Sequence, residues 1–151
     1  MRNLGSEKKF VHEIVGQNSR LDTLQATILN IKLKKLDKLN KKRQMIAKFY
    51  NKNIKNQKIK KLNYSLNAVY HQYVIIVKKR KEFIKYLDKK NIDFGFHYPF
   101  SINQLKVFRK KLTSKKYENA ENLANHGISI PIDPNLNQKQ LRYIVNNLNS
   151  F

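Results

Sequence analysis

The sequence has 151 residues, no cysteine and a formal charge of +22 at neutral pH. A chain of this length with 40% hydrophobic residues can bury one core, so we expect a single domain over residues 1–151. The lack of cysteine excludes disulfides and thiolate metal sites. The longest purely apolar run, Val74 to Val77, is far too short to span a bilayer, and the first ten residues hold no signal-peptide core. These features predict a cytoplasmic protein without a membrane segment.

The positive charge would ordinarily indicate a nucleic-acid surface, since clustered lysine and arginine neutralise phosphates. Here the excess is nearly all lysine and is scattered along the whole chain. Lys34, Lys35 and Lys38 follow helical spacing on the side opposite Leu33 and Leu36, which is typical of a solvated helix face. The residues therefore favour a solvated face and leave nucleic-acid binding as an alternative.

The first predicted element is a long helix after an irregular or extended opening. Apolar residues recur at helical intervals from Leu21 to Tyr50, and no proline or glycine interrupts them. The pattern predicts one helix that ends near Asn53, or two helices that meet near Leu39 and Asn40.

Elements of both types follow this helix. Residues 51–61 are predicted to be the helix end and a loop, whereas β-branched and aromatic residues predict a strand within 68–78. Helical spacing returns over residues 80–90, and Asn91 stands where a left-handed residue would end the helix.

The next segments are shorter. Residues 92–100, IDFGFHYPF, are predicted to form a short strand and then a loop at Pro99. Residues 116–126 are predicted to form a helix that stops at Gly127, and residues 128–133 are predicted to be extended.

The last element is a helix with a clear start. Asn137 is the predicted N-cap, with Gln140 three residues later completing a capping box. The apolar stripe of this helix is Leu141, Ile144, Val145 and Leu148. The order of elements predicts an α+β fold in which a small sheet is covered by helices.

The residues alone assign no catalytic group and no metal site. None of the ten acidic residues forms a close pair with a histidine that would suggest a general acid and base. The histidines lack metal-ligand spacing and are spread along the chain as His12, His71, His97 and His126.

Two polar clusters remain as candidate binding sites. Residues 16–20 place Asn18, Ser19 and a guanidinium at the expected helix start, where they would contact a phosphate or would only cap the helix. The residues alone favour the cap. Residues 96–99 place two polar rings at the end of a predicted strand. These rings would either bind a ligand or pack in an aromatic core, and the sequence favours neither interpretation clearly.

Four separated motifs carry a family resemblance. They are RNLGSEKKFVHEIVGQNSRLDTLQATIL, VYHQYVIIVKKR, NIDFGFHYP and ENAENLANHGISIPIDPNLNQKQLRYIVNNL. In this order they resemble the C-terminal part of the DegT/DnrJ/StrS family of sugar-nucleotide aminotransferases, which depend on pyridoxal 5'-phosphate (PLP). The resemblance implies the small C-terminal domain of a fold type I PLP-dependent transferase.

The resemblance also implies a reaction and site residues. Such enzymes are homodimers that move an amino group from glutamate to a keto-sugar on a nucleoside diphosphate, for polysaccharide or deoxyamino-sugar synthesis. By resemblance, Asn18 reaches the phosphate of the PLP held by the other subunit, and Arg20 lies near the cofactor. His97 and Tyr98 match the motif that borders the sugar-nucleotide pocket.

The resemblance lacks one part of the family pattern. The cofactor-binding lysine of the large domain has no counterpart in these 151 residues. We therefore expect a chain that is inactive alone and needs a large-domain half or a full-length aminotransferase subunit. One alternative is an orphan small domain that acts as a binding or regulatory module. A basic nucleic-acid-binding protein is the less favoured alternative.

Overall fold

The computed structural model describes residues 6–8, 11–12, 14–19, 21–63, 67–109, 112 and 117–151. The chain divides into two compact units, residues 1–38 and 39–151, and helix α1 (Thr23–Asn53) contributes to both. In the first unit, strands β1 (Ser6–Lys8) and β2 (Val11–His12) pair antiparallel. The expectation of one domain over the whole chain stays a prediction.

Helix α1 is continuous through Leu39 and Asn40, so the first of the two predicted alternatives is confirmed. Asp22 caps it, because its Oδ1 accepts hydrogen bonds from the backbone N–H groups of Leu24, at 2.7 Å, and Gln25, at 3.2 Å. A carboxylate at this position also interacts favourably with the positive end of the helix dipole.

The apolar residues in the first half of α1 are exposed. Leu29, Leu33 and Leu36 are 53%, 64% and 44% exposed to solvent. Burial within this helix starts only at Ile46. The predicted helical periodicity is therefore confirmed, but the apolar residues in the first half of α1 do not pack against any core in the described part of the chain.

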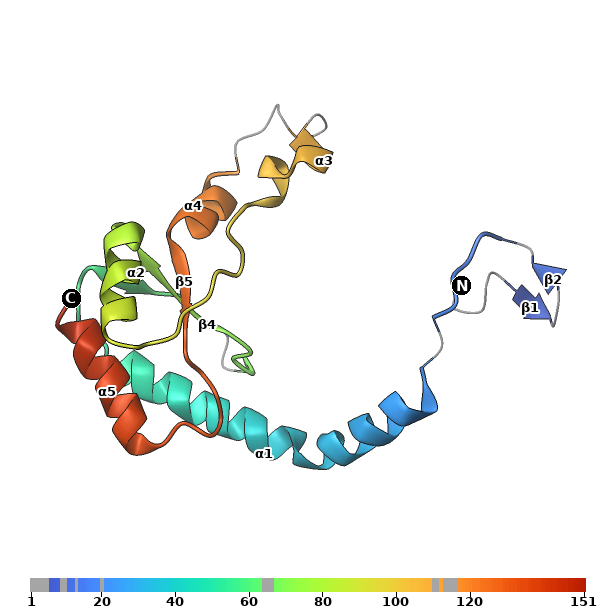
Figure 1. Ribbon diagram of the computed structural model, residues 1–151, viewed down its shortest axis with the longest axis horizontal. Helices are drawn as coiled ribbons and strands as arrows, with labels where there is room; N and C mark the ends of the chain where they lie inside the picture. The colour runs from blue at the N-terminus through green and yellow to red at the C-terminus, as the bar shows by residue number, and fades with distance from the viewer. Residues whose placement is uncertain are drawn as a thin grey trace. The chain divides into compact units, whose positions relative to one another are not determined.

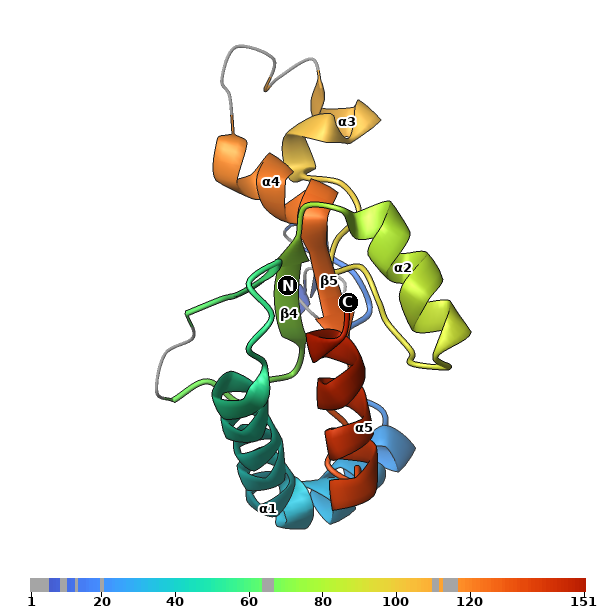
Figure 2. The ribbon, with the colours of Figure 1, turned by 90° about the vertical axis from the view of Figure 1, so that its left-hand side faces the viewer.

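The second unit is built on a three-stranded antiparallel sheet in the order β3-β4-β5 (Figures 1 and 2). Its strands are β3 (Ile59–Lys61), β4 (Tyr73–Val77) and β5 (Gly127–Ile130). Strand β4 confirms the predicted strand, although it is shorter than expected. The predicted loop over residues 51–61 is wrong in its last three residues, which form edge strand β3.

The helices of this unit lie where the sequence predicts them. They are α2 (Arg80–Lys89), α4 (Glu118–His126) and α5 (Gln138–Asn149). Two short helices between α2 and α4, η1 (Ile102–Gln104) and α3 (Lys106–Arg109), were not predicted. Asn91 follows α2 with a φ of 49°, which confirms the left-handed stop. Figure 2 shows α2 beside β4 and β5, and α5 beside the second half of α1.

One face of the sheet forms the core with these helices. Alternate residues of β4 are buried, and Tyr73 and Ile75 pair with Ile130 and Ile128 of β5 on the same face. The cluster is completed by α1, α2 and α5, including the predicted stripe of α5, in which Leu141, Ile144, Val145 and Leu148 are all buried. The α+β class is confirmed.

The capping box of α5 leads to a stability prediction. Asn137 Oδ1 accepts the N–H of Gln140 and Gln140 Oε1 accepts the N–H of Asn137, both at 2.9 Å. We expect Asn137→Ala to lower the free energy of unfolding by about 0.5–2 kcal/mol in urea denaturation. Asn146→Ala, an exposed change inside the same helix, is the control, and its effect should be neutral or slightly stabilising because alanine is the better helix former. Equal losses in both variants would contradict the capping role.

Candidate functional site

The candidate site lies at the free edge of strand β5. Gly95 and Ser129 exchange two backbone hydrogen bonds, with N···O distances of 3.0 and 2.8 Å. The strand predicted within residues 92–100 is therefore wrong apart from this single antiparallel bridge. A bridge is enough to fix which face the neighbouring side chains occupy, because residues two apart in an extended segment point to the same side.

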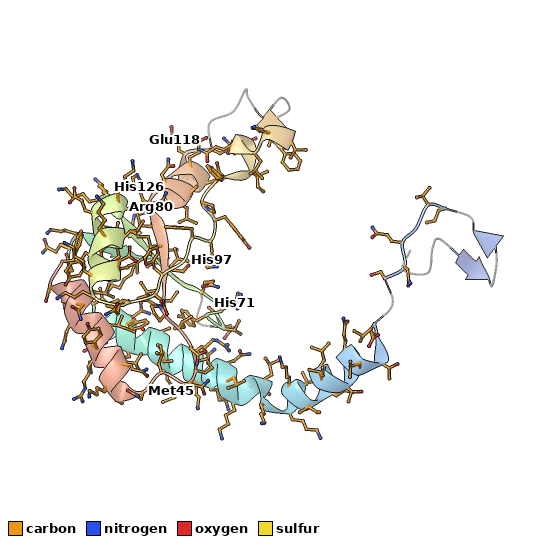
Figure 3. The ribbon with its side chains drawn as sticks, viewed as in Figure 1. Met45, His71, Arg80, His97, Glu118 and His126 are labelled. Atoms are coloured by element: carbon orange, nitrogen blue, oxygen red, sulfur yellow. The ribbon has the colours of Figure 1, made fainter. Side chains whose placement is uncertain are left out.

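The position of the His97 side chain follows from this geometry. It is two residues after Gly95, and its Nδ1 lies 2.9 Å from the hydroxyl of Ser129. Figure 3 shows His97 beside β5. A Cβ atom added at Gly95 would come within 2.9 Å of the His97 ring, so glycine leaves the space that the ring fills. The hydroxyl of Ser129 and the bare backbone of Gly95 together set the position of the imidazole.

A cavity of about 240 Å³ opens at the same place. Its polar lining side chains are Gln72, Asp93, His97 and Ser129. Gln72 immediately precedes β4, the strand that pairs with β5, and lines the same cavity. The amide of Gln72, the carboxylate of Asp93 and the imidazole of His97 supply both donors and acceptors, whereas the Ser129 hydroxyl is bonded to His97.

Tyr98 lies next to His97 but is not packed in the core. Its side chain is 75% exposed, and its ring stands edge-on to the His97 ring with centroids 5.9 Å apart. The alternative of aromatic core packing is therefore wrong for Tyr98. Phe94 and Phe96, by contrast, pack against each other, with ring centroids 5.7 Å apart. The structure brings His97 and Tyr98 together at the surface, and ligand binding by them stays a prediction.

Asn18 and Arg20 belong to the first unit. Asn18 and Ser19 are both exposed, and the start of α1 is capped by Asp22, so the predicted capping role of Asn18 or Ser19 is wrong. The N–H groups of Leu24 and Gln25 are paired with Asp22, so an anion would have to be bound by other donors, of which the exposed amide of Asn18 is one. Arg20 lies outside the described residues. A contact of Asn18 with phosphate stays a prediction.

The sequence did not predict Ser129, Gly95 or Gln72 as parts of this site. One signal was available, because Ser129 is a polar residue between Ile128 and Ile130 in an otherwise apolar strand. A polar side chain in such a place needs a partner. That the partner is His97 depends on the pairing of two segments far apart in the chain, which the sequence did not reveal.

A metal-binding cluster and a membrane-spanning helix are both absent from the described part of the chain. Among these residues, no three histidine, aspartate or glutamate side chains lie close enough to hold a metal ion. Within the same residues, no helix has the length and apolar character needed to cross a bilayer. His71 is exposed, whereas His126 keeps a buried Nδ1 without a partner among the described residues.

Known proteins similar to this chain share its fold over almost its whole length. The crystal structure of Streptomyces venezuelae DesV in complex with a ketimine intermediate superposes with a TM-score of 0.89 at 29% identity, over 99% of this chain and 41% of DesV. This confirms the predicted fold. The dTDP-3-amino-3,6-dideoxy-alpha-D-galactopyranose transaminase of Aneurinibacillus thermoaerophilus is 35% identical over 100% of this chain and 42% of its own length.

A third relative carries a different nucleotide in its name. The UDP-N-acetyl-3-dehydro-alpha-D-glucosamine 3-aminotransferase of Acidithiobacillus ferrooxidans is 29% identical over 95% of this chain and 39% of its own length. The chain thus spans about two fifths of the length of these relatives, in agreement with a C-terminal part. A model of the family matches residues 1–149. The chain belongs to the DegT/DnrJ/EryC1/StrS aminotransferase family.

Proposed function

We propose that this chain is the C-terminal part of a PLP-dependent aminotransferase that moves an amino group from glutamate to a nucleotide-linked keto-sugar. The observation that carries the proposal is the polar cavity at His97, on a chain that matches the family over residues 1–149. The two relatives named above act on dTDP-linked and UDP-linked sugars. A sugar offers hydroxyl groups to the donors and acceptors of this cavity.

His97 and Tyr98 are proposed to bind the nucleotide sugar. Both side chains are exposed, and each offers a polar hydrogen to an oxygen of the ligand. The Tyr98 ring also presents a large apolar surface, 75% exposed, on which a flat or apolar part of the ligand can lie. Their role is to hold and orient the sugar rather than to transfer a proton.

Asn18 and Arg20 are proposed to hold the cofactor of the partner subunit. The donor chemistry fits PLP, because the exposed amide of Asn18 can donate to a phosphate oxygen and a guanidinium pairs with anions. When bound, PLP supplies the electron sink that allows an amino group to be exchanged. No lysine of this chain is assigned to the cofactor. That group is proposed to come from the large domain.

A large-domain partner is the second part of the proposal. The relatives are more than twice as long as the matched region, with coverages of 42% and 39%. The exposed residues Leu29, Leu33 and Leu36 supply an apolar surface that a partner can bury. We propose that this partner is a large-domain polypeptide or a full-length aminotransferase subunit, and that the chain alone does not transaminate.

Co-expression with the complementary large-domain polypeptide tests the proposal. We expect the two polypeptides to co-purify and to release 2-oxoglutarate from glutamate in the presence of PLP and a dTDP- or UDP-linked keto-sugar. The chain alone should release none. Amino transfer by the chain alone, or no association with any large-domain polypeptide, would contradict the proposal. The second result would favour an orphan binding module.

The proposed role of Asn18 has its own prediction. In the assembled enzyme, we expect Asn18→Ala to raise the PLP concentration needed for half-maximal activity by about tenfold or more, since a hydrogen bond to a charged group is lost. Asn30→Ala removes an equally exposed amide from α1 and should leave the PLP requirement unchanged. Equal PLP requirements for both variants would exclude Asn18 from the cofactor site.

A further inference from the structure

We propose that Ser129 is a positioning residue that holds neutral His97 in the tautomer with its hydrogen on Nε2, so that His97 offers an N–H donor to an oxygen of the nucleotide sugar. The binding part of this inference rests on the proposed function. The positioning part rests on the geometry of β5 and can be tested by itself.

The first step concerns the hydroxyl of Ser129. The residue is only 4% exposed, and among the described residues its side chain has a single hydrogen-bond partner, His97 Nδ1, at 2.9 Å. Its backbone N–H and C=O are both bonded to Gly95. If Nδ1 carried the hydrogen, the hydroxyl would accept it, and its own O–H would stay buried without an acceptor. Such a group costs free energy.

The second step concerns the imidazole. The hydroxyl avoids this cost by donating to Nδ1, and Nδ1 can accept only when it carries no hydrogen. A neutral imidazole has one hydrogen, which must then be on Nε2. Among the described residues, Nε2 has no hydrogen-bond partner, and His97 lines the 240 Å³ cavity. His97 therefore presents a donor that remains free for a ligand.

The third step concerns the orientation of the ring. Gly95 is bonded through its backbone to Ser129, and a Cβ on Gly95 would meet His97 Cε1 at 2.9 Å. The ring thus has a hydroxyl on one nitrogen and the bare glycine backbone near Cε1. Both contacts depend on the backbone bridge between Gly95 and Ser129, so strand β5 determines the direction of the Nε2–H bond. A donor with a fixed direction selects an acceptor oxygen at one place.

Nuclear magnetic resonance of the full chain tests the positioning step without any ligand. Long-range ¹H–¹⁵N correlations recorded at alkaline pH distinguish the two tautomers of neutral His97. We expect the Nε2–H tautomer in the wild type, with a nuclear Overhauser contact between His97 Hε1 and Gly95 Hα. In Ser129→Ala we expect mixed tautomers and loss of that contact. The signals of exposed His71 should be unchanged.

Two further variants keep the test decisive if Ser129→Ala fails to fold. Ser129→Thr retains the hydroxyl and should keep the wild-type tautomer. Gly95→Ala displaces the ring while leaving Ser129 intact, and it should shift His97 to mixed tautomers. An Nδ1–H tautomer in the wild type, or unchanged His97 signals in Ser129→Ala or Gly95→Ala, would overturn the inference.

The assembled aminotransferase gives the second readout. We expect Ser129→Ala to raise the KM for the nucleotide sugar by about tenfold with kcat within twofold, because binding rather than the chemical step is weakened. A lowered kcat with an unchanged KM would contradict a role in substrate orientation. If the assembly accepts no nucleotide sugar, the proposed function fails while the tautomer result stands. If the tautomer is wrong, the positioning role fails even in an active enzyme.

Discussion

Replacing Phe83 with alanine is expected to lower the free energy of unfolding by about 3–5 kcal/mol. Phe83 is a fully buried residue of α2, and its ring packs edge-on against Phe151 with centroids 4.8 Å apart. The deletion removes apolar contacts and leaves a cavity between α2 and the C-terminal residue, which the sheet and helices cannot fill without moving. Urea denaturation followed by circular dichroism measures this loss.

Phe100→Ala provides the matched control for Phe83. It deletes the same atoms from a side chain that is 63% exposed, so we expect a change within about 0.5 kcal/mol. Similar losses in the two variants would mean that Phe83 does not pack in the core as the structure shows. The comparison thus separates burial from any general effect of removing a phenylalanine.

Tyr50→Phe is the second substitution with a large expected effect. The hydroxyl of Tyr50 donates a 2.7 Å hydrogen bond to the carbonyl of Pro131, which ties α1 to the segment after β5. The ring is buried and packs edge-on against Tyr73, with centroids 5.1 Å apart. Removing the hydroxyl leaves a partly buried carbonyl unpaired, and we expect a loss of about 1–3 kcal/mol in the free energy of unfolding.

The pH dependence gives Tyr50 a distinctive signature. Burial, and then the nearby Tyr73, raise the pKa of Tyr50 above its ordinary value. A group whose pKa is raised in the folded state contributes its stability fully below the unfolded pKa, which for tyrosine is about 10. That contribution is lost as the pH rises above about 10. The wild type should therefore lose stability as the pH rises beyond about 10, and Tyr50→Phe should lose less over the same alkaline range.

Tyr143→Phe is the control for the tyrosine prediction. Tyr143 also donates to a backbone carbonyl, that of Lys90 at 3.0 Å, but its side chain is 49% exposed. Water can replace that bond, so we expect a change in the free energy of unfolding within about 0.5 kcal/mol. An alkaline loss that persists unchanged in Tyr50→Phe would show that other groups cause it.

Local patterns were sufficient to predict the helices of the second unit. In α5, the capping residues Asn137 and Gln140 and the apolar stripe belong to one short segment, so the sequence holds all the interactions that define the helix. Asn91 is a similar case, because a single residue with a left-handed conformation ends α2. In both cases the residues that determine the start or end of the helix lie within one or two helical turns of it.

The features that were missed depend on contacts between distant segments. Strand β3 has only three residues and is held by pairing with β4, which its own sequence does not indicate. Residues 92–100 have strand-like composition but make only one bridge. The link between His97 and Ser129 spans 32 positions, so it could be found only once the pairing of Gly95 with Ser129 was known.

The exposed leucines of α1 have a consequence for how such a chain is maintained in a cell. A helix that carries unburied leucine is a substrate for chaperones and proteases and promotes aggregation until a partner covers it. Leu29, Leu33 and Leu36 all lie in the first half of α1, outside the core of the second unit. If the proposed large-domain partner covers these leucines, the amount of soluble chain is expected to follow the amount of that partner, so that their expression ratio rather than folding stability sets the abundance of the chain.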